Sequence, residues 1–441
     1  MHAERRAVDA DRGSHPRRGA TDPCVRAIRR HCGEDVRRGA ILGLIAILAG
    51  ACGPMTPTPS SPPATDVAIA PTSIAQASPI PVPKHEVYGF VPYWEMDDTI
   101  ATHVGATDLT TLGLFSVTHK RNGTLDPQTG LSRIRGPIGQ SMIRAAHDRG
   151  TRVEIVYTSF GTTKNRRFYD DPKAQDRWIE ALVGLVQELG IDGINVDVEA
   201  IPIDLVPAYG AFVGRLRTAL RDHLPDAQLS VATQGNETGA AMAAVAANAG
   251  ADRIFLMGYD YRTAGTEPGA SAPIDRMDGQ EKDLVWSLDL YATLGVPSDK
   301  LLLGLPLYGV MWPVIGPGFL APSSGRGDAW VPRRNLRVFE DPSFAPTFEP
   351  TESVEFYTVP TAFGSPDPSS EVGGTSPAAS PEPVAWDAVY YDSPRSLTPK
   401  LRLADERGLA GAGFWAIGYE RGLPGYTEMI AAFRAGKLPA E

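Results

Sequence analysis

The sequence predicts an α/β protein whose main part is a (β/α)8 TIM barrel with a small insertion between strands seven and eight. From His85 onward, eight apolar, strand-like runs alternate with amphipathic helical stretches. The main alternative is a doubly wound open sheet, in which a glycine-rich phosphate loop commonly follows the first strand. No such loop is visible in the sequence. The count of eight runs and this missing loop favour the barrel.

The strand-like runs are expected at regular places along the chain. They cover residues 87–94, 111–118, 153–160, 193–200, 228–234, 253–261, 300–309 and 410–418. Helices are expected between them, over 205–220, 283–294 and 396–407. A further helix before residue 193 has clear end signals, because Asp171 suits its N-cap, Pro172 its first turn and Gly190 its C-terminal exit.

Residues 310–383 interrupt the alternation and form the predicted insertion. Within them, 337–340 (RVFE) and 354–360 (VEFYTVP) are interpreted as short strands. Residues 365–383 are rich in Pro, Ser and Gly and are expected to be a disordered tip. The barrel as a whole is expected to span residues 85–438.

Residues 1–51 are interpreted as a signal region rather than as part of the fold. The run AILGLIAILAGA at 40–51 suits the apolar core of a signal peptide, and Arg37 and Arg38 precede it. The stretch LAGAC at 48–52 resembles a bacterial lipobox, which makes Cys52 the expected lipidation site. Plain secretion is the alternative. A further hypothesis is that translation starts near Val36.

Residues 52–84 are rich in Pro, Ser, Thr and Ala and are interpreted as a tether. With a lipid anchor, the domain would be an extracytoplasmic cell-surface lipoprotein held at a membrane; without one, it would be secreted. The formal net charge is −10, although residues 1–51 are basic. An acidic body argues against a nucleic-acid partner, because phosphates would repel it.

The fourth strand carries a row of polar side chains on one face. In DGINVDVE (192–199), Asn195, Asp197 and Glu199 share one parity, and the apolar residues between them share the other. Burying unpaired carboxylates is costly, and confined acids shift one another's pKa, which suits a general acid. Because barrel chemistry lies at the C-terminal ends of strands, these acids are candidate catalytic groups. A buried polar network that supports the barrel is the alternative.

These residues resemble the D-G-x-D-x-D-x-E signature of glycoside hydrolase family 18, the family of chitinases and related N-acetylglucosaminidases. VYGFVPYW, FLMGYDY, LLLGLPLYG and GAGFWAIG resemble its first, sixth, seventh and eighth strands. The resemblance covers roughly residues 87–435. Asn195 in place of the middle Asp is similar to bacterial members related to spore-cortex and peptidoglycan-acting enzymes.

The resemblance implies retaining, substrate-assisted hydrolysis of β-1,4 bonds in chitin or peptidoglycan. Glu199 would be the acid and base, Asp197 would hold the acetamido N–H, and Tyr259 would bond the acetamido oxygen. No metal or cofactor is required. The expected substrate-binding residues are Asn195, Trp415, Asp260, Met257, Phe90, Tyr93 and Trp94. Tyr88, Tyr308 and Trp312 are further candidates for the cleft lining.

Three departures from the family pattern bear on rate and pH optimum. Asn195 removes a like charge beside Asp197, so Asp197 is expected to ionise more easily. Val198 stands where an aromatic residue is common, and Phe90 where many members have a Tyr. Glu199 is retained, which argues against the second hypothesis, a glycan-binding barrel that does not cut. A third reading is hydrolysis of another amino-sugar glycan.

Overall fold

The computed structural model describes residues 84–361 and 385–439. The predicted signal region, residues 52–83 of the tether, the lipidation site Cys52 and the predicted tip at 365–383 lie outside the described residues. In the described part of the chain, no helix combines the length and the apolar character needed to cross a bilayer.

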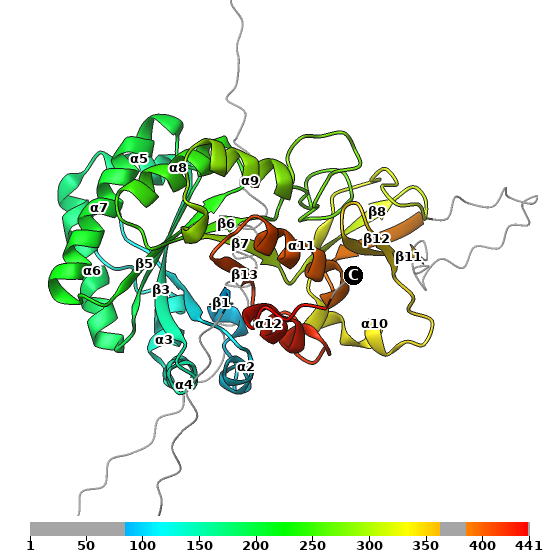
Figure 1. The fold of residues 1–441 in the computed structure, drawn as a ribbon, viewed down its shortest axis with the longest axis horizontal. Helices are drawn as coiled ribbons and strands as arrows, with labels where there is room; N and C mark the ends of the chain where they lie inside the picture. Colours follow the sequence, from blue (N-terminus) through cyan, green and yellow to red (C-terminus); the bar gives the residue numbers. More distant parts are fainter. Residues whose placement is uncertain (1–83, 362–384, 440–441) are drawn as a thin grey trace, which may run out of the picture. The chain divides into compact units, whose positions relative to one another are not determined.

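Eight parallel strands close into a barrel, as the sequence predicts (Figure 1). Around the barrel, β1 is followed by β13, β7, β6, β5, β4, β3 and β2, which returns to β1. In chain order the strands are β1 (Glu86–Pro92), β2 (Thr111–Val117), β3 (Arg152–Phe160), β4 (Gly193–Glu199), β5 (Gln228–Gln234), β6 (Arg253–Met257), β7 (Leu301–Pro306) and β13 (Gly411–Trp415).

Several strands end earlier than predicted, and the early ends of β1 and β6 matter for the site. β1 ends at Pro92, and the chain turns into the 3-10 helix η1 (Tyr93–Glu95). β6 ends at Met257, so Tyr259 and Asp260 lie in the loop that follows it. Asp260 has a φ of 64°, a left-handed conformation that no strand contains. These loop residues therefore leave the barrel wall and lie at its rim.

Helices follow the strands and cover the barrel from outside (Figure 1). They are α2 (Ile100–Ala106), α3 (Thr129–Arg135), α4 (Pro137–His147), α5 (Thr162–Tyr169), α6 (Pro172–Leu189), α7 (Val206–His223), α8 (Glu237–Asn248), α9 (Leu284–Thr293), α11 (Pro394–Glu406) and α12 (Tyr426–Arg434), with 3-10 turns η2 (Ile203–Leu205) and η3 (Ser298–Lys300). The predicted end signals of α6 are confirmed: Asp171 accepts a bond from Ala174 N at 3.0 Å, and Gly190 is left-handed.

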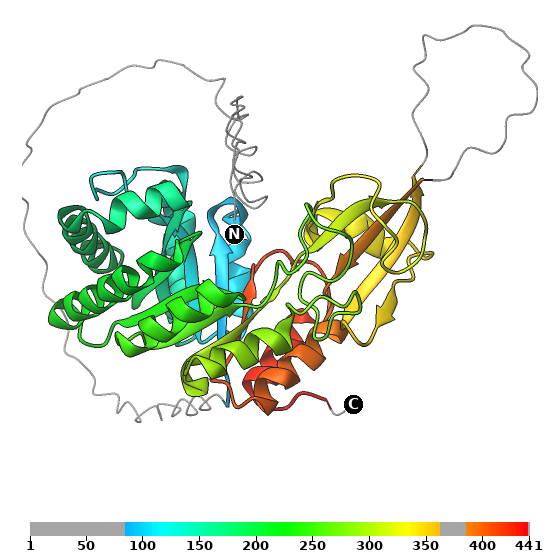
Figure 2. The ribbon, with the colours of Figure 1, turned by 90° about the horizontal axis from the view of Figure 1, so that it is seen from above.

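A second, five-stranded sheet forms between β7 and β13, in the order β10, β11, β12, β8 and β9 (Figure 2). Its strands are β8 (Gly309–Val314), β9 (Asp328–Trp330), β10 (Thr347–Glu349), β11 (Val354–Thr361) and β12 (Ala385–Tyr391). The sheet thus extends beyond the predicted end of the insertion at residue 383, because β12 pairs with both β11 and β8. The prediction of a strand over 354–360 is confirmed by β11.

The prediction of a strand over 337–340 is wrong. This stretch lies in the short helix α10 (Leu336–Glu340), which follows the 3-10 turn η4 (Pro332–Asn335). The Phe339 ring packs against Trp330 and Tyr391, with ring centroids 5.8 Å away in each case. Tertiary packing of this one aromatic ring outweighs the weak strand preference of the stretch.

Buried ion pairs connect the second sheet to its surroundings. Arg262, in the loop after β6, makes two 2.7 Å bonds to Glu352, and both side chains are almost fully buried. Lys400 on α11 pairs with Asp392, which directly follows β12, and neither is exposed. Buried charges persist only when they are paired in this way. The loop that carries Tyr259 and Asp260 is therefore held at a defined place.

The barrel interior is filled mainly by aromatic side chains. Tyr88, Phe90, Phe115 and Phe255 pack there with Val156, Ala232 and Leu302. Glycines on the neighbouring strands make room for the rings. A Cβ at Gly304 would lie 2.3 Å from the Phe255 ring, and one at Gly113 would lie 2.9 Å from the Tyr88 hydroxyl. The polar row of β4 is embedded in this cluster.

Candidate active site

The polar row of β4 faces the barrel interior and rises toward its open end. In register, Asn195 lies beside Ser230 of β5, Asp197 beside Thr158 of β3, and Glu199 at the last position of the strand. Exposure increases along the row, from fully buried at Asn195 to partly exposed at Glu199. The sequence pattern therefore becomes a column with one acid at the mouth and one below it.

Asp197 is buried, with 5% of its surface exposed. Burial raises the pKa of Asp197 to about 7, and its Oδ1 has no hydrogen-bond partner among the described residues. The sequence suggested easier ionisation because Asn195 carries no charge. The structure shows that desolvation dominates over this effect. Asp197 is thus poised to change its protonation near neutral pH.

Glu199 is held by side chains from two neighbouring elements. Its Oε2 accepts a bond from Gln234 Nε2 at 3.2 Å. Its backbone carbonyl accepts from Asn165 Nδ2 at 2.6 Å and from Gly161 N at 3.3 Å. Because the strand end is fixed from β5 and from α5, the carboxyl group keeps a defined position at the mouth of the barrel.

Gln234 was not among the residues that sequence reasoning selected. The available signal was its parity: it is the last residue of β5 and shares its face with Ser230. It also lines a small pocket of about 330 Å³ beside the acid, together with Asn236, Glu237 and Lys282. A polar residue at the end of a neighbouring strand is therefore a signal for a site residue, as the polar row of β4 is.

Replacing Gln234 by Met is expected to lower kcat of the glycan hydrolysis that the sequence predicts by about tenfold. A hydrogen bond to a carboxyl group contributes about 1.5–3 kcal/mol, and the 3.2 Å length places this one at the lower end. Asn236→Ser is the matched control, because it removes the amide that contacts Gln234 at 3.3 Å but keeps a side-chain cap for α8. Equal rates for Gln234→Met and wild type would contradict the role.

Tyr259, Asp260 and Met257 are brought to the same end of the barrel by the β6 exit. Met257 packs in the interior aromatic cluster, and Tyr259 packs edge-on against Tyr308 with ring centroids 6.2 Å apart. The Tyr308 hydroxyl donates to Asp260 Oδ1, and the Asp260 N–H donates to Ser271 Oγ at 3.0 Å. Asp260 is therefore engaged with the loop, while Tyr259 stays partly exposed beside it.

Trp415 ends β13 and is surrounded by other aromatic rings. Its ring centroid lies 4.7 Å from Phe115, 5.7 Å from Phe90 and 6.4 Å from Trp94. Trp94 is fixed in turn, because its Nε1 donates to the Tyr419 hydroxyl at 3.0 Å, and Tyr93 packs edge-on against it. Partly exposed Trp415 can therefore present a rigid apolar surface to a ligand.

Several residues predicted to touch substrate are buried in the structure. Phe90 is only 2% exposed and packs beneath Trp415, while Asn195 is fully buried and donates to Ser230 Oγ at 2.7 Å. Tyr88 is buried in the barrel, and Trp312 in the second sheet. Their inward parity or their place beneath other rings explains this. Phe90 supports the Trp415 ring, whereas Trp312 belongs to the separate core of the second sheet.

A second acid lies below the row and was also missed. Glu154 on β3 is fully buried, and its Oε2 accepts bonds from the Tyr88 hydroxyl at 2.7 Å and from the Ser230 hydroxyl. Gln228 Nε2 donates to Oε1 at 2.8 Å. The signal was again parity, since Glu154 in VEIVYTSF alternates with the outward apolar residues.

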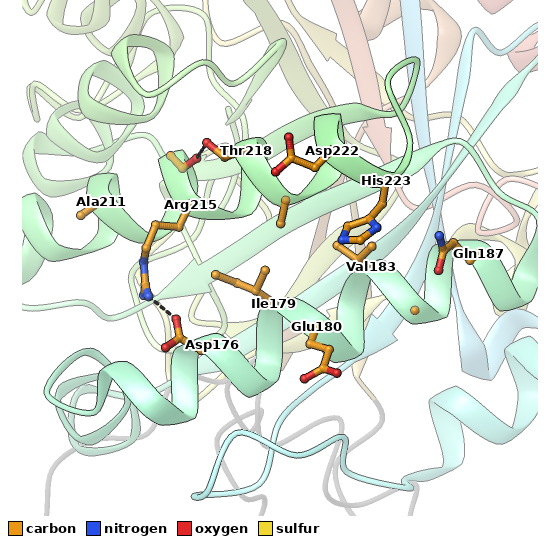
Figure 3. A pocket seen from close by; sticks show the side chains of 13 residues that line it. Asp176, Ile179, Glu180, Val183, Gln187, Ala211, Arg215, Thr218, Asp222 and His223 are labelled. Atoms are coloured by element: carbon orange, nitrogen blue, oxygen red, sulfur yellow. Dashed lines mark hydrogen bonds and ion pairs between the residues drawn. The ribbon is translucent and has the colours of Figure 1, made fainter.

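Within residues 84–361 and 385–439, no group of three His, Cys, Asp or Glu side chains is arranged to hold a metal ion. Another groove, of about 870 Å³, lies between α6 and α7 and shares no residue with the site (Figure 3). The Arg215–Asp176 ion pair at 2.5 Å spans that groove. The candidate active site is therefore the mouth of the barrel.

Comparisons with known proteins agree with this geometry. Residues 85–420 match the model of glycosyl hydrolases family 18. The cortical fragment-lytic enzyme of Bacillus cereus is 24% identical over 324 residues, which cover 70% of this chain and 65% of that protein. The chain thus spans slightly less than two thirds of this relative's length. Chitinase 63 of Streptomyces plicatus is 27% identical over 282 residues, which cover 60% of this chain and 42% of that protein.

Solved structures show the same fold at low identity. The spore cortex-lytic enzyme SleL of Bacillus cereus superimposes with a TM-score of 0.60 at 18% identity, covering 79% of this chain and 74% of that one. A group IV chitinase of Ostrinia furnacalis, in complex with allosamidin, gives 0.66 at 16% identity and covers 80% of this chain and all of that one. With the family model matched over most of the chain, the protein belongs to the glycosyl hydrolases of family 18.

Proposed function

We propose that the protein hydrolyses β-1,4 glycosidic bonds beside N-acetylglucosamine, with retention of configuration and with the substrate's own acetamido group as nucleophile. One observation carries the proposal. Glu199 is fixed at the barrel mouth by Gln234, directly above the buried acid Asp197, which has no partner for its Oδ1 among the described residues. An acid at the mouth and a hydrogen-bond acceptor below it are what this chemistry needs.

In the first step, the Glu199 carboxyl group gives its proton to the glycosidic oxygen, and the bond from that oxygen to the anomeric carbon breaks. The acetamido oxygen of the same sugar forms a bond to the anomeric carbon and gives an oxazolinium ion. Asp197, in its ionised form, accepts the acetamido N–H and stabilises the developing positive charge. Preorganised groups of this kind act strongly in a water-poor site.

Two aromatic residues position the sugar. Tyr259, partly exposed at the β6 exit, donates its hydroxyl to the acetamido oxygen. Trp415 supplies the floor beneath the sugar ring, supported by Phe90 and Phe115. In the second step, Glu199 takes a proton from water, and the water oxygen attacks the anomeric carbon from the face that the leaving group had occupied. The bond between the anomeric carbon and the acetamido oxygen breaks, which restores the acetamido group. The product keeps the β configuration.

The proposed substrates are chitin or peptidoglycan. The chemistry is common to both polymers, since each contains β-1,4-linked N-acetylglucosamine. The relatives that carry the names chitinase and cortical fragment-lytic enzyme support each of the two. Hydrolysis of another amino-sugar glycan is the remaining enzymatic alternative.

The experiment that tests the proposal is hydrolysis of N-acetylglucosamine oligomers and of purified peptidoglycan, followed by proton NMR of the first products. We expect cleavage with the β-anomer formed first, before mutarotation. An α-anomer as first product would show inversion and contradict the substrate-assisted mechanism. The polymer that is cut faster identifies the natural substrate class.

A barrel that binds glycans without cutting them is the second candidate. A chitinase-like agglutinin from Robinia pseudoacacia has this fold, with a TM-score of 0.62 at 18% identity over 78% of this chain and 98% of that one. The placement of Glu199 at the mouth favours hydrolysis. Oligomer binding by calorimetry, combined with no release of shorter products, would favour the binding role.

The proposed location is outside the cytoplasm, at a membrane through a lipid on Cys52 or in secreted form. The motif LAGAC at 48–52 and the tether that follows it support the lipid anchor. Cell fractionation tests the anchor: Cys52→Ala is expected to move the protein from the membrane fraction to the soluble fraction. An unchanged membrane fraction would argue against lipidation at Cys52.

A further inference from the structure

The buried acid Glu154 has partners that define the direction of each hydrogen bond around it. Its two oxygens accept from the Tyr88 hydroxyl, the Ser230 hydroxyl and the Gln228 amide. A hydroxyl group has one proton to give. Since Ser230 gives its proton to Glu154, Ser230 Oγ can only accept from its other neighbour, Asn195.

This direction determines which way the Asn195 side chain faces. Its Nδ2 points to Ser230 Oγ at 2.7 Å, so its Oδ1 points away. Asn195 Oδ1 has no hydrogen-bond partner among the described residues, and neither has Asp197 Oδ1. Both residues are inward neighbours on β4, about 7 Å apart along the strand. At this spacing of the two residues along the strand, a side-chain rotation or one water molecule is what would connect the two Oδ1 atoms.

An amide oxygen cannot donate, so it favours a neighbour that carries a proton. A contact between Asn195 Oδ1 and Asp197 would therefore stabilise the protonated form of Asp197. If the amide turned over, its Nδ2 would face Asp197 and stabilise the ionised carboxylate. The orientation of one amide group thus decides which protonation state of Asp197 is preferred.

We propose that Glu154 is a positioning residue that controls, through Ser230 and Asn195, whether Asp197 carries a proton. The inference rests on the proposed function in so far as ionised Asp197 is the form that holds the acetamido N–H. When Glu154 is ionised, the chain of donors runs from Asn195 to Ser230 to Glu154. When Glu154 is protonated, it donates to Ser230, whose hydroxyl turns to Asn195 Oδ1 and frees Nδ2 for Asp197.

The two acids then hold one negative charge between them. In each state one acid is protonated and the other ionised, and the amide and the hydroxyl transmit the state by turning over. The proton that one acid releases goes to solvent and the other acid takes one from solvent, so no bonds of the protein change except the O–H bonds of the acids themselves. Burial also raises the pKa of Glu154 to about 7, near that of Asp197, so that both states are accessible near neutral pH.

Other titratable groups lie near Glu154 and Asp197, but they do not form the connection that Ser230 and Asn195 provide. Tyr88 of β1 contacts Glu154, and its charge interactions include both acids. Asp252, in the loop before β6, acts on Glu154, and Tyr209 of α7 interacts with Asp197. Glu199 is the next inward residue above Asp197. Tyr88 hydrogen-bonds Glu154, and no bond from Tyr88 to Asp197 is seen in the described residues.

The proposal also explains the neutral residue at position 195. An Asp there would place a carboxylate beside Ser230, which Glu154 already uses, and directly below Asp197. Three confined acids would repel one another. Here the second acid is Glu154 on β3 and not a residue of β4. An amide at position 195 can present either its oxygen or its N–H group to Asp197.

The test is a titration of the full chain labelled with 13C at the Asp carboxyl carbons, followed by NMR. The Asp197 signal is identified by its loss in Asp197→Asn. Glu154→Gln removes the charge and supplies an amide donor to Ser230, and it is expected to lower the pKa of Asp197 by about one unit. Ser230→Ala keeps the Glu154 charge but cuts the link to Asn195, and it is expected to lower that pKa by a smaller amount.

Ser116→Ala is the matched control, because it removes a hydroxyl that bonds Thr158 and not the link. It is expected to leave the pKa of Asp197 in place. An unchanged or raised pKa in Glu154→Gln would overturn the proposal. If the pKa of Asp197 is lower in Glu154→Gln but unchanged in Ser230→Ala, the effect is one of charge alone. That outcome would also overturn the proposal. If Glu154→Gln fails to fold, Ser230→Ala alone decides.

The titration needs no turnover, so it is independent of the proposed function. If the wild type hydrolyses no glycan, the proposed function is wrong. The titration would still test whether Glu154 acts on Asp197 through Ser230 and Asn195. If the wild type is active, the acidic limb of its kcat/KM profile should move to lower pH in both variants, in step with the pKa of Asp197.

Discussion

Glu199→Gln is expected to lower kcat of glycan hydrolysis by about 10²–10⁴-fold while oligomer binding changes little. The Gln side chain has the size of Glu and can keep a contact with Gln234, but it has no acidic proton for the glycosidic oxygen. In the proposed mechanism the same group later accepts a proton from water, so both steps of the reaction are expected to slow down.

A second Glu→Gln substitution nearby separates the loss of the catalytic acid from a general loss of negative charge. Glu237→Gln is the control, because Glu237 lies beside the same small pocket and pairs with Lys282 at 2.8 Å on the surface. It is expected to retain nearly full activity. The measurement is initial rate on N-acetylglucosamine oligomers, with binding followed by calorimetry. A Glu199→Gln variant that keeps more than about a tenth of kcat would show that another group is the acid.

The fold could be predicted because its signals are local and repeated. Each barrel strand is a short apolar run, and α6 has a cap, a first-turn proline and a left-handed exit that are all visible in the sequence. Strand ends were harder, because the turn at Tyr93 and the left-handed Asp260 depend on contacts with distant residues. The same is true of α10, whose Phe339 packs against a strand more than 50 residues later.

The site was predicted only as far as one strand could show it. The row of β4 is visible because its three polar residues alternate within one motif. Glu154, Ser230 and Gln234 belong to β3 and β5, and single polar residues in apolar strands look unremarkable until the register places them beside Asn195 and Glu199. Burial also could not be predicted from one strand. Phe90 was expected at the ligand surface, but it lies buried in the layer below that surface.

Asp197→Asn is expected to lower kcat by about 10²–10³-fold, because an uncharged amide cannot stabilise the positive charge of the proposed oxazolinium ion. Wild-type kcat/KM should rise with pH through about 7, as the raised pKa of Asp197 implies and as the ionised form requires. The variant has no group to titrate at this position, so its profile should lack that limb.

The same substitution should stabilise the protein at high pH. Below about pH 4, Asp197 is protonated in both the folded and the unfolded chain and contributes no difference. Between pH 4 and 7 the unfolded chain releases the proton while the folded chain keeps it, so the free energy of unfolding falls as pH rises. Above pH 7 this loss is complete, and it is of order 1–4 kcal/mol.

Asn at position 197 avoids that loss, and the Oδ1 atom that it replaces has no partner among the described residues to lose. Urea unfolding should therefore show similar stabilities for wild type and variant near pH 4, and a more stable variant at pH 8. A residue that only supports the barrel would lose stability and activity together. A variant that is less active but more stable at pH 8 is expected if Asp197 is buried for catalysis at a cost in stability. A variant that is destabilised at pH 8 would contradict a catalytic role for Asp197.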